Sequence, residues 1–424
     1  MKITNTFRFR LKLIDLLTGL KIYNVLDLFK KEQYLSKKEL DEIRQQRLNR
    51  LFAIAKKSTA YYAGFNSFDE LPILTKKIIN NNPADFLSNI YNGKLFKKST
   101  SGSTGTPFYY NSSANAQSHL WAGLLHSWES SGYRFGDKVA IVSGSALVKT
   151  SARHSIFYQL MNMDLYPVGT LTDKIVAGYI EKIRQKKTRL IYGYALAVNI
   201  MADYMIQNNI APLKGLLGIV STAEMLTDKT RSNIEKAFGC KVFNQYGCNE
   251  AGIASFECEK HQLHLISSRC VYETDKEGNL IGTDLANEAC ILMKFKTGDL
   301  VEFSEEGCSC GRNYPVIKNI IGRSDDIITD RNNKKIHSSY FNFMFKKDKS
   351  IKQYQVLFDE KSLSLNLLVD DDFSEKNYTH LMSSVKGDLD FEEYEIKTVE
   401  QFYTNKNFKH TYIIDKRKHK LTAV

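Results

Sequence analysis

Residues 190–250 read LIYGYALAVNIMADYMIQNNIAPLKGLLGIVSTAEMLTDKTRSNIEKAFGCKVFNQYGCNE, and this stretch predicts the fold of the chain. Short runs of β-forming residues alternate in it with longer runs that have helical spacing. The expected strands cover 190–194, 216–220 and 241–246, and the expected helices cover 196–209 and 227–238. Strands that alternate with helices of this length form parallel sheets with helices on their faces. We therefore expect an α/β fold built on a mainly parallel sheet.

Polar residues follow two of these expected strands directly. Ser221-Thr222-Ala223-Glu224 ends one of them, and Tyr246-Gly247-Cys248-Asn249-Glu250 ends another. In open parallel sheets, ligands bind in the crevice beyond the carboxyl ends of the strands. Both segments are therefore predicted to line one crevice.

Upstream, residues 100–107 read Thr-Ser-Gly-Ser-Thr-Gly-Thr-Pro and follow the basic pair Lys97-Lys98. Glycines let a backbone approach a ligand closely, while hydroxyls and successive N–H groups donate to phosphate oxygens. The spacing of Gly102 and Gly105 is not that of a Walker loop, and no Gly-Lys-Ser/Thr follows. The segment therefore indicates a polyanion-binding loop, with a flexible surface loop as the alternative.

The remainder of the chain suggests helical and α+β regions around this core. Apolar residues at helical spacing predict an α-helical N-terminal region, and shorter, turn-separated strands begin near residue 253. The polar break Gly322-Arg323-Ser324-Asp325-Asp326 is the best candidate for a domain hinge, and a small α+β domain follows it. The expected segments are helices over 8–31, 37–64, 114–131, 173–187 and 375–386, a strand over 289–295 before a Thr-Gly-Asp turn at 297–299, and strands over 354–358, 363–369 and 413–414.

Composition limits the function classes. The chain has 424 residues with 43% hydrophobic and 25% charged residues, which is typical of a soluble protein of two or three domains. Its net charge of +12 suits polyanionic ligands, but we find no nucleic-acid-binding signature. Neither a membrane-spanning run nor a signal peptide is evident, so we expect a cytoplasmic protein. Residues 1–31 are basic and amphipathic, so contact with a membrane surface and packing on the protein's own domain both remain open.

A second constellation predicts a structural metal. Cys258, Cys308 and Cys310 offer three thiolates, and a histidine near Cys258 offers an imidazole, which together suit tetrahedral Zn²⁺. His264 is the expected fourth ligand, with His261 as the alternative. Unligated thiols in a reducing compartment are the competing interpretation. We expect the other cysteines to be buried thiols, namely Cys240, Cys248, Cys270 and Cys290.

The ordered motifs TSGSTGTP, STAEM, YGCNE, TGDL, GRSDD and a late lysine resemble those of the adenylate-forming acyl and aryl acid ligases. Within that superfamily the chain is most similar to the phenylacetate-CoA ligase-like branch, which includes members associated with capsular polysaccharide biosynthesis. The resemblance implies a large N-terminal domain over 1–322, with the helical region at 1–80, and a small mobile C-terminal domain over 323–424 that rotates about Asp325. Some members of this branch carry a similar Cys/His cluster with zinc.

The resemblance also implies roles for individual residues. The loop would hold the β- and γ-phosphates of ATP, Tyr246 would stack on adenine, and Glu250 would bind Mg²⁺. Asn249 occupies the position where the family usually has threonine or serine, and it would therefore lie near the α-phosphate. Lys409 would bridge the carboxylate and the α-phosphate, with Lys406 as the alternative, because Phe408 replaces the usual glycine. The other implied binding residues are Ser101, Ser103, Thr104, Gly105 and Thr106 in the loop, Ala223 and Glu224 beside adenine, and Asp299 and Arg323 near the ribose.

By this resemblance the chain would use ATP and Mg²⁺ to activate a small carboxylic acid as an acyl-adenylate. The acyl group would then pass to the thiol of coenzyme A or of a carrier protein. One alternative is direct transfer to an amine or hydroxyl of a sugar in surface polysaccharide synthesis. Another is a nucleotide-binding regulatory or scaffold protein without catalysis. We expect the acid pocket among residues 142–148, 192–197 and 219–224.

Overall fold

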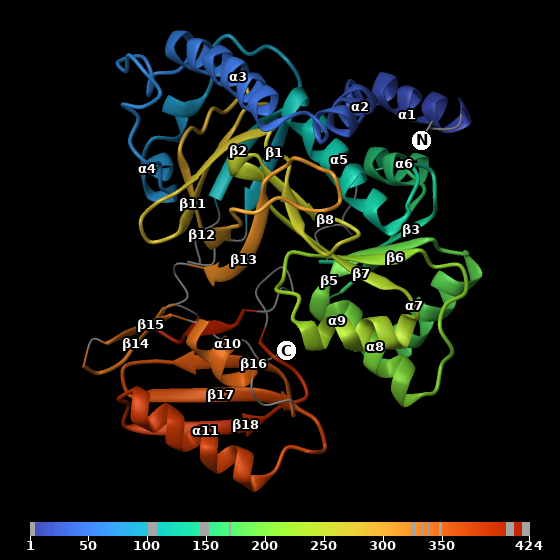
Figure 1. Cartoon of the computed structure of the whole chain (residues 1–424), viewed down its shortest axis with the longest axis vertical. Coiled ribbons are helices and arrows are strands. Elements are labelled where there is room, and N and C mark those ends of the chain that lie inside the picture. The colour runs from blue at the N-terminus through green and yellow to red at the C-terminus, as the bar shows by residue number, and fades with distance from the viewer. Residues whose placement is uncertain are drawn as a thin grey trace. The chain divides into compact units, whose positions relative to one another are not determined.

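The computed structural model describes residues 5–100, 108–144, 152–168, 171–323, 327–332, 334–337, 339–346, 350–403 and 411–417. These residues form two compact units (Figure 1). The larger unit holds the described part of residues 1–297 together with 301–320, and the smaller unit holds Gly298–Leu300 and the described residues from Ile321 onward. The sequence placed this boundary at 322/323, and the predicted hinge residue Asp325 lies outside the described residues.

The N-terminal region is helical, as expected, but its first helix is interrupted. Instead of one helix over 8–31, there are two, α1 (Asn5–Thr18) and α2 (Ile22–Glu32). Gly19 separates them because it adopts a left-handed conformation with φ of 73°, which ends a helix at little steric cost. The third helix, α3 (Lys37–Ser58), begins at a capping box in which Ser36 and Glu39 satisfy each other's backbone N–H groups.

An 11-stranded sheet forms the body of the larger unit, in the order β10-β11-β12-β13-β9-β8-β7-β6-β5-β3-β4. The pairs β4–β3, β3–β5, β5–β6 and β6–β7 are parallel, as the alternation over 190–250 predicted. Helices α8 and α9 lie side by side against this parallel part (Figure 1). The elements are α5 (Ala114–Trp128), β3 (Val139–Ser143), α6 (Ala152–Leu160), β4 (Met163–Pro167), α7 (Asp173–Gln185), β5 (Leu190–Tyr194), α8 (Ala195–Gln207), β6 (Gly218–Thr222), α9 (Asp228–Phe238) and β7 (Lys241–Cys248).

From β8 onward the sheet is no longer parallel: β7–β8, β8–β9, β9–β13 and β10–β11 pair antiparallel. The predicted strand over 289–295 is wrong, since the strand there begins only at Phe295 and runs through the expected Thr-Gly-Asp turn. Gly298 has φ of 83° within that strand, so it supplies the conformational freedom of a turn without ending the strand. The strands are β8 (Ile253–Glu257), β9 (Leu263–Leu265), β10 (Cys270–Thr274), β11 (Asn279–Asp284), β12 (Phe295–Phe303) and β13 (Val316–Arg323).

A hairpin of two strands, β1 (Leu95–Thr100) and β2 (Phe108–Ser113), flanks the Ser/Thr/Gly loop. The strands pair antiparallel from Leu95↔Ser113 to Thr100↔Phe108. Residues 101–107 therefore connect two paired strands, and they lie outside the described residues. The short helices α4 (Lys76–Asn81) and η1 (Pro83–Phe86) precede the hairpin.

The smaller unit is α+β and has its own apolar core, which includes Phe341, Val356, Leu365 and Val385. Its four-stranded sheet has the order β18-β17-β16-β19. The predicted helix and strands are present, but strands β14, β15 and β18 and helix α10 were not predicted. The elements are β14 (Ile327–Thr329), β15 (Lys335–His337), α10 (Ser339–Lys346), β16 (Ile351–Phe358), β17 (Ser362–Val369), α11 (Glu375–Asp388), β18 (Glu393–Thr398) and β19 (Ile413–Asp415). Within the described parts of the chain, no helix is both long and apolar enough to cross a lipid bilayer.

Candidate functional site

The carboxyl ends of β3, β5, β6 and β7 meet at one edge of the large sheet, because these strands are parallel and adjacent. The pairing of Tyr194 with Thr222 and of Thr222 with Gln245 aligns their ends. The chain leaves β6 at Ala223, whereas Tyr246 to Cys248 continue in β7, paired with β8, and the chain leaves β7 at Asn249. The sequence predicted a ligand-binding crevice at this edge, which is the position where parallel sheets bind ligands.

The turn after β6 has an unusual backbone and a specific anchor. Ala223 has φ of 67°, a left-handed conformation that costs a non-glycine residue about 1 kcal/mol. The carboxylate of Glu224 accepts a hydrogen bond from the backbone N–H of Leu196 at 2.9 Å, in the first turn of α8. A carboxylate at a helix N-terminus is stabilised by the unpaired N–H groups and the helix dipole. Glu224 thus fastens the turn after β6 to the start of α8, a contact that motif spacing did not indicate.

Two tyrosines of β5 also line this edge, although they were predicted only as part of a broad pocket range. Tyr192 is hydrogen-bonded to the side chain of Thr222, and burial raises the pKa of its phenol. Tyr194 is hydrogen-bonded to the backbone of Gly144 and interacts electrostatically with Glu224, and burial likewise raises its pKa. Both phenols therefore stay neutral at physiological pH. The strand-end aromatic pair was detectable in the sequence as Tyr-Gly-Tyr, but only the pairing of β3, β5 and β6 shows what surrounds it.

The end of β7 positions Tyr246, Asn249 and Glu250. The hydroxyl of Ser255 on β8 donates to the carbonyl oxygen of Tyr246 at 2.8 Å, which ties the two strands together at this point. Asn249 and Glu250 lie in the short helix η4 (Asn249–Ala251), and the Cys248 thiol lies 3.6 Å from Glu250 Oε2. Glu250 is only 9% exposed, so its carboxylate is held in a largely buried position. A buried carboxylate at such a strand end suits a hard divalent cation.

Gly252 closes this turn, and we predict that Gly252→Ala destabilises the protein by about 3 kcal/mol. Its φ is 68°, and an added Cβ would lie 2.6 Å from Asp284 Cα, so the backbone of the Glu250 turn would have to move. Gly278→Ala is the matched control, because Gly278 has φ of 83° but its nearest neighbour would be 3.7 Å away. Thermal unfolding of both variants measures the difference, and equal loss in the two would contradict a steric role for Gly252.

The two residues predicted to bind the ribose lie in strands β12 and β13. Asp299 lies within β12 rather than in the expected turn, and Arg323 is the last residue of β13. The remaining predictions concern residues outside the described parts of the chain, so they stay predictions: Ser101, Ser103, Thr104, Gly105, Thr106, Asp325, Lys406 and Lys409.

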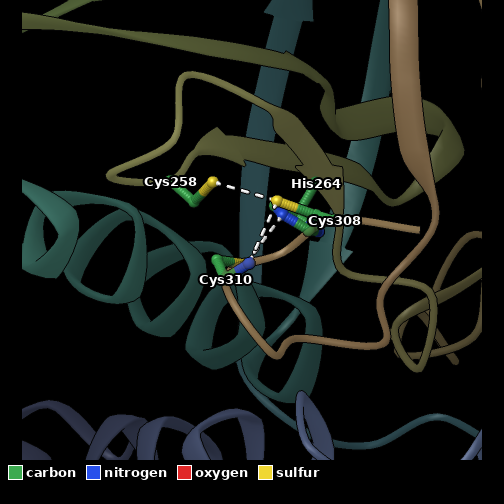
Figure 2. Close-up of side chains that lie close together, drawn as sticks. All are labelled: Cys258, His264, Cys308 and Cys310. Carbon is green, nitrogen blue, oxygen red and sulfur yellow. Dashed lines mark hydrogen bonds between the residues drawn. The ribbon is translucent and has the colours of Figure 1, made fainter. Parts of the chain in front are cut away.

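Elsewhere in the larger unit, the structure brings together the four residues of the predicted metal site (Figure 2). Their ligand atoms all lie within 4.8 Å of one another. The sulfur atoms of Cys258 and Cys308 are 3.7 Å apart, and Cys310 Sγ is 3.3 Å from His264 Nε2. Cys258 follows β8, His264 lies in β9, and the two other cysteines lie in the loop between β12 and β13.

The surroundings of this cluster orient its donors toward one point. His264 Nδ1 lies 3.0 Å from the carbonyl oxygen of Tyr314, so Nδ1–H donates there and Nε2 presents its lone pair to the cysteines. The backbone N–H of Lys260 donates to the sulfur of Cys258, and that of Cys310 donates to the sulfur of Cys308. A histidine fixed by a carbonyl and sulfurs that accept from amides are the usual outer contacts of metal ligands. Donor type and geometry therefore fit a tetrahedral zinc ion.

The alternative ligand, His261, is directed elsewhere. Its Nδ1 lies 2.9 Å from Glu257 Oε1, and its ring stacks on Phe243. Both carboxylate oxygens of Glu257 also accept hydrogen bonds from Nη2 of Arg231, each at 3.0 Å. The structure therefore brings His264, and not His261, to the three sulfur atoms. Of the other cysteines, Cys270 and Cys290 are buried as predicted, whereas Cys240 and Cys248 are partly exposed.

No protein-family model matches the chain. The chain is 26% identical over 401 residues to Protein CapK of Staphylococcus aureus, a match that covers 88% of this chain and 86% of CapK. It is 24% identical over 330 residues to phenylacetate-coenzyme A ligase of Thermus thermophilus, which covers 70% of this chain and 73% of that ligase.

Solved structures share the fold. The crystal structure of 2-hydroxyisobutyryl-CoA ligase in the postadenylation state, in complex with 2-HIB-AMP, matches with a TM-score of 0.71 at 17% identity and covers 92% of each chain. The anthranilate CoA ligase AuaEII in complex with anthranoyl-AMP matches with a TM-score of 0.52 at 13% identity, over 75% of this chain and 66% of AuaEII. The resemblance noted from the motifs is thus borne out by similarity to CapK and to phenylacetate-coenzyme A ligase along most of the chain, and the fold is the one seen in these solved CoA ligases.

Proposed function

We propose that this protein is an ATP-dependent, AMP-forming ligase that activates a carboxylic acid and transfers the acyl group to coenzyme A. The observation that supports this most directly is the edge where β6 and β7 end, which gathers Glu224, Tyr246, Asn249 and the buried Glu250. In the first step, a carboxylate oxygen of the acid forms a bond to the α-phosphorus of ATP, and pyrophosphate leaves as its bond to that phosphorus breaks. In the second, the thiol loses its proton, its sulfur bonds to the acyl carbon, and AMP leaves as the bond between the acyl carbon and its phosphate oxygen breaks.

The first step brings two anions together, so fixed positive charge and hydrogen-bond donors must offset their repulsion as charge develops. We assign Glu250 to hold Mg²⁺, whose charge, when bound, neutralises phosphate oxygens. Asn249 adjoins it and would donate from its amide to the α-phosphate. Tyr246 would stack on adenine, while the anchor between Glu224 and α8 holds the opposite wall of the slot in place. Asp299 and Arg323 would bind the ribose.

The relatives favour coenzyme A as the acceptor, because one curated relative and several structural neighbours are named as CoA ligases. A carrier-protein thiol would react by the same chemistry. The similarity to CapK leaves a second candidate, direct transfer to an amine or hydroxyl of a sugar. A protein that binds nucleotide without catalysis is the third. The seven cysteines and the use of ATP suit a cytoplasmic location.

The first experiment is to measure pyrophosphate release from ATP and Mg²⁺ across aromatic, hydroxy, amino and short aliphatic acids, without coenzyme A. Release with one class of acid would establish adenylation and identify the substrate class. Product analysis with and without coenzyme A would then separate thioester formation from direct acyl transfer. ATP binding with no release for any acid would favour the protein without catalysis.

We predict that Lys409→Ala lowers acid-dependent pyrophosphate release by about 100-fold while ATP binding is retained. The reason is that a fixed cation between the two reacting anions acts mainly in the transition state. Lys406→Ala is the matched control within the same basic segment. The opposite result, with loss only in Lys406→Ala, would move the role to Lys406, and full activity in both variants would contradict a catalytic lysine in this segment.

We also propose that Cys258, His264, Cys308 and Cys310 hold a structural zinc ion. Four protein donors leave no open coordination position, so the ion would tie the segment after β8 to the loop before β13 rather than take part in the reaction. Burial raises the pKa of the Cys258 thiol to about 12. A bound divalent cation would lower the pKa of the thiols instead, because it stabilises the thiolates.

A further inference from the structure

Helix α1 is apolar on two opposite sides. Leu11 and Ile14 are buried and pack into the core that contains Leu125 and Trp128 of α5. The other side of the helix also carries large apolar residues, and these face outward. Phe9 is 72% exposed, Leu16 is 79% exposed and Leu17 is 64% exposed, and the partly exposed Leu13 lies between them.

These four side chains form one continuous stripe. In a helix, residues at positions i, i+4, i+7 and i+8 lie on the same face, and Phe9, Leu13, Leu16 and Leu17 have this spacing. Single exposed apolar residues are common on soluble proteins, but a contiguous apolar patch marks a surface that contacts a partner. The buried face of α1 already packs against the core, so folding of the larger unit does not require the stripe.

Helix α1 is joined to the neighbouring helix α6, which also carries an exposed apolar residue. Arg10 Nη2 donates to the carbonyl oxygen of Gln159 at 3.0 Å, which joins α1 to α6, and the two helices lie close together (Figure 1). Ile156 of α6 is 54% exposed. The apolar surface is therefore fixed to the body of the larger unit.

The charged side chains of α1 that flank the stripe are basic. On a helical wheel Arg10 and Lys12 lie on its two sides, and Lys12 covers the ring of Tyr23 at 5.1 Å. Lys94 reaches the C-terminal end of α1, where its Nζ donates to the carbonyl oxygen of Thr18. Within α1 the acidic residue is Asp15, and its carboxylate is occupied by the backbone N–H groups of Ile22 and Tyr23.

We propose that this stripe docks the protein onto the surface of an anionic lipid bilayer, with α1 lying in the plane of the interface. An apolar face flanked by cations has the chemistry of such helices: the apolar side chains enter the acyl boundary while the cations meet lipid phosphates. A second copy of the chain fits the stripe less well. A symmetric contact through α1 would bring the cations of two chains, each with a net charge of +12, against each other.

Co-sedimentation of the full chain with vesicles tests this proposal. We expect binding to vesicles of phosphatidylcholine mixed with phosphatidylglycerol, and much weaker binding to pure phosphatidylcholine or at high salt. The double variant Leu16→Asp with Leu17→Asp is expected to bind the anionic vesicles at least about 100-fold more weakly, given the cost of withdrawing two leucines from an apolar phase. Because both residues are exposed, the variant keeps the melting temperature of the parent.

The matched control is Ile90→Asp, which removes an apolar residue that is 60% exposed outside α1 and is expected to leave binding unchanged. Absence of vesicle binding by the parent chain, equal binding to neutral vesicles, or full binding by the double variant would each overturn the proposal. Light scattering could instead show that the parent chain forms a dimer, that the double variant does not, and that neither binds lipid. That result would also overturn the proposal, because the stripe would then be an interface between copies.

Discussion

Replacement of Glu250 by glutamine is expected to lower acid-dependent pyrophosphate release by about 1,000-fold, as measured at saturating ATP. The substitution preserves the shape of this largely buried side chain but removes its charge at the end of β7, where the proposed Mg²⁺ site lies. A neutral amide is a weak ligand for a hard cation, so the Mg²⁺ concentration needed for half-maximal rate is expected to rise as well. Glu250→Asp retains the charge on a shorter side chain, and its rate of pyrophosphate release is expected to lie between those of the parent protein and Glu250→Gln.

The control for this prediction is Glu302→Gln, since Glu302 is a surface carboxylate on β12 that pairs with Lys318 at 2.7 Å. An exposed pair of this kind contributes little, so both rate and Mg²⁺ dependence are expected to match the parent protein. Parental rate and Mg²⁺ dependence in Glu250→Gln would contradict the assignment of this residue, and the search for the metal-binding carboxylate would move to other residues of the crevice.

Removal of a ligand from the Cys/His cluster is the second large effect that we expect. His264→Ala is predicted to weaken zinc binding by at least about 1,000-fold, because loss of an outer contact alone costs 10- to 100-fold. Zinc content of the purified protein, measured by atomic absorption, is expected to fall from one ion per chain to none. The melting temperature is expected to fall with it, since a structural ion contributes its binding energy to folding.

His261→Ala provides a matched control, because His261 lies three residues away in sequence and pairs with Glu257 instead. It is expected to retain one zinc ion per chain, as is Cys240→Ser, whose thiol lies outside the cluster. Zinc loss in His261→Ala with retention in His264→Ala would reverse the assignment. A parent protein without zinc, after expression in zinc-supplemented medium, would favour free thiols.

These two sets of variants separate the two proposed sites. Glu250→Gln is expected to change the reaction and leave zinc content and thermal stability near those of the parent. His264→Ala is expected to change stability first, with activity falling only as the larger unit loses its structure. A zinc-site variant that kept its stability but lost adenylation would indicate that the ion takes part in the chemistry, contrary to the proposal.

The sequence by itself determined the parallel part of the sheet, since strands and helices over 190–250 depend on local composition and periodicity. It also determined the chemistry of the sites, because a Cys-x-Cys pair or a carboxylate after a strand has the same donor atoms in any fold. The sequence also predicted a turn at the Thr-Gly-Asp segment. This prediction was wrong, because Asp299 lies within β12. A glycine with positive φ serves a bulged strand as well as a turn, and only strand pairing distinguishes them.

Tertiary structure decided which residues meet. The sequence favoured His264 as the zinc ligand but left His261 as the alternative. The pairing of β9 with β8 and β13 brings His264 to the cysteines and leaves His261 with Glu257. The anchor of Glu224 on α8 and the outward face of α1 likewise depend on contacts between distant segments. Such contacts are set by packing over the whole larger unit, which no local pattern encodes.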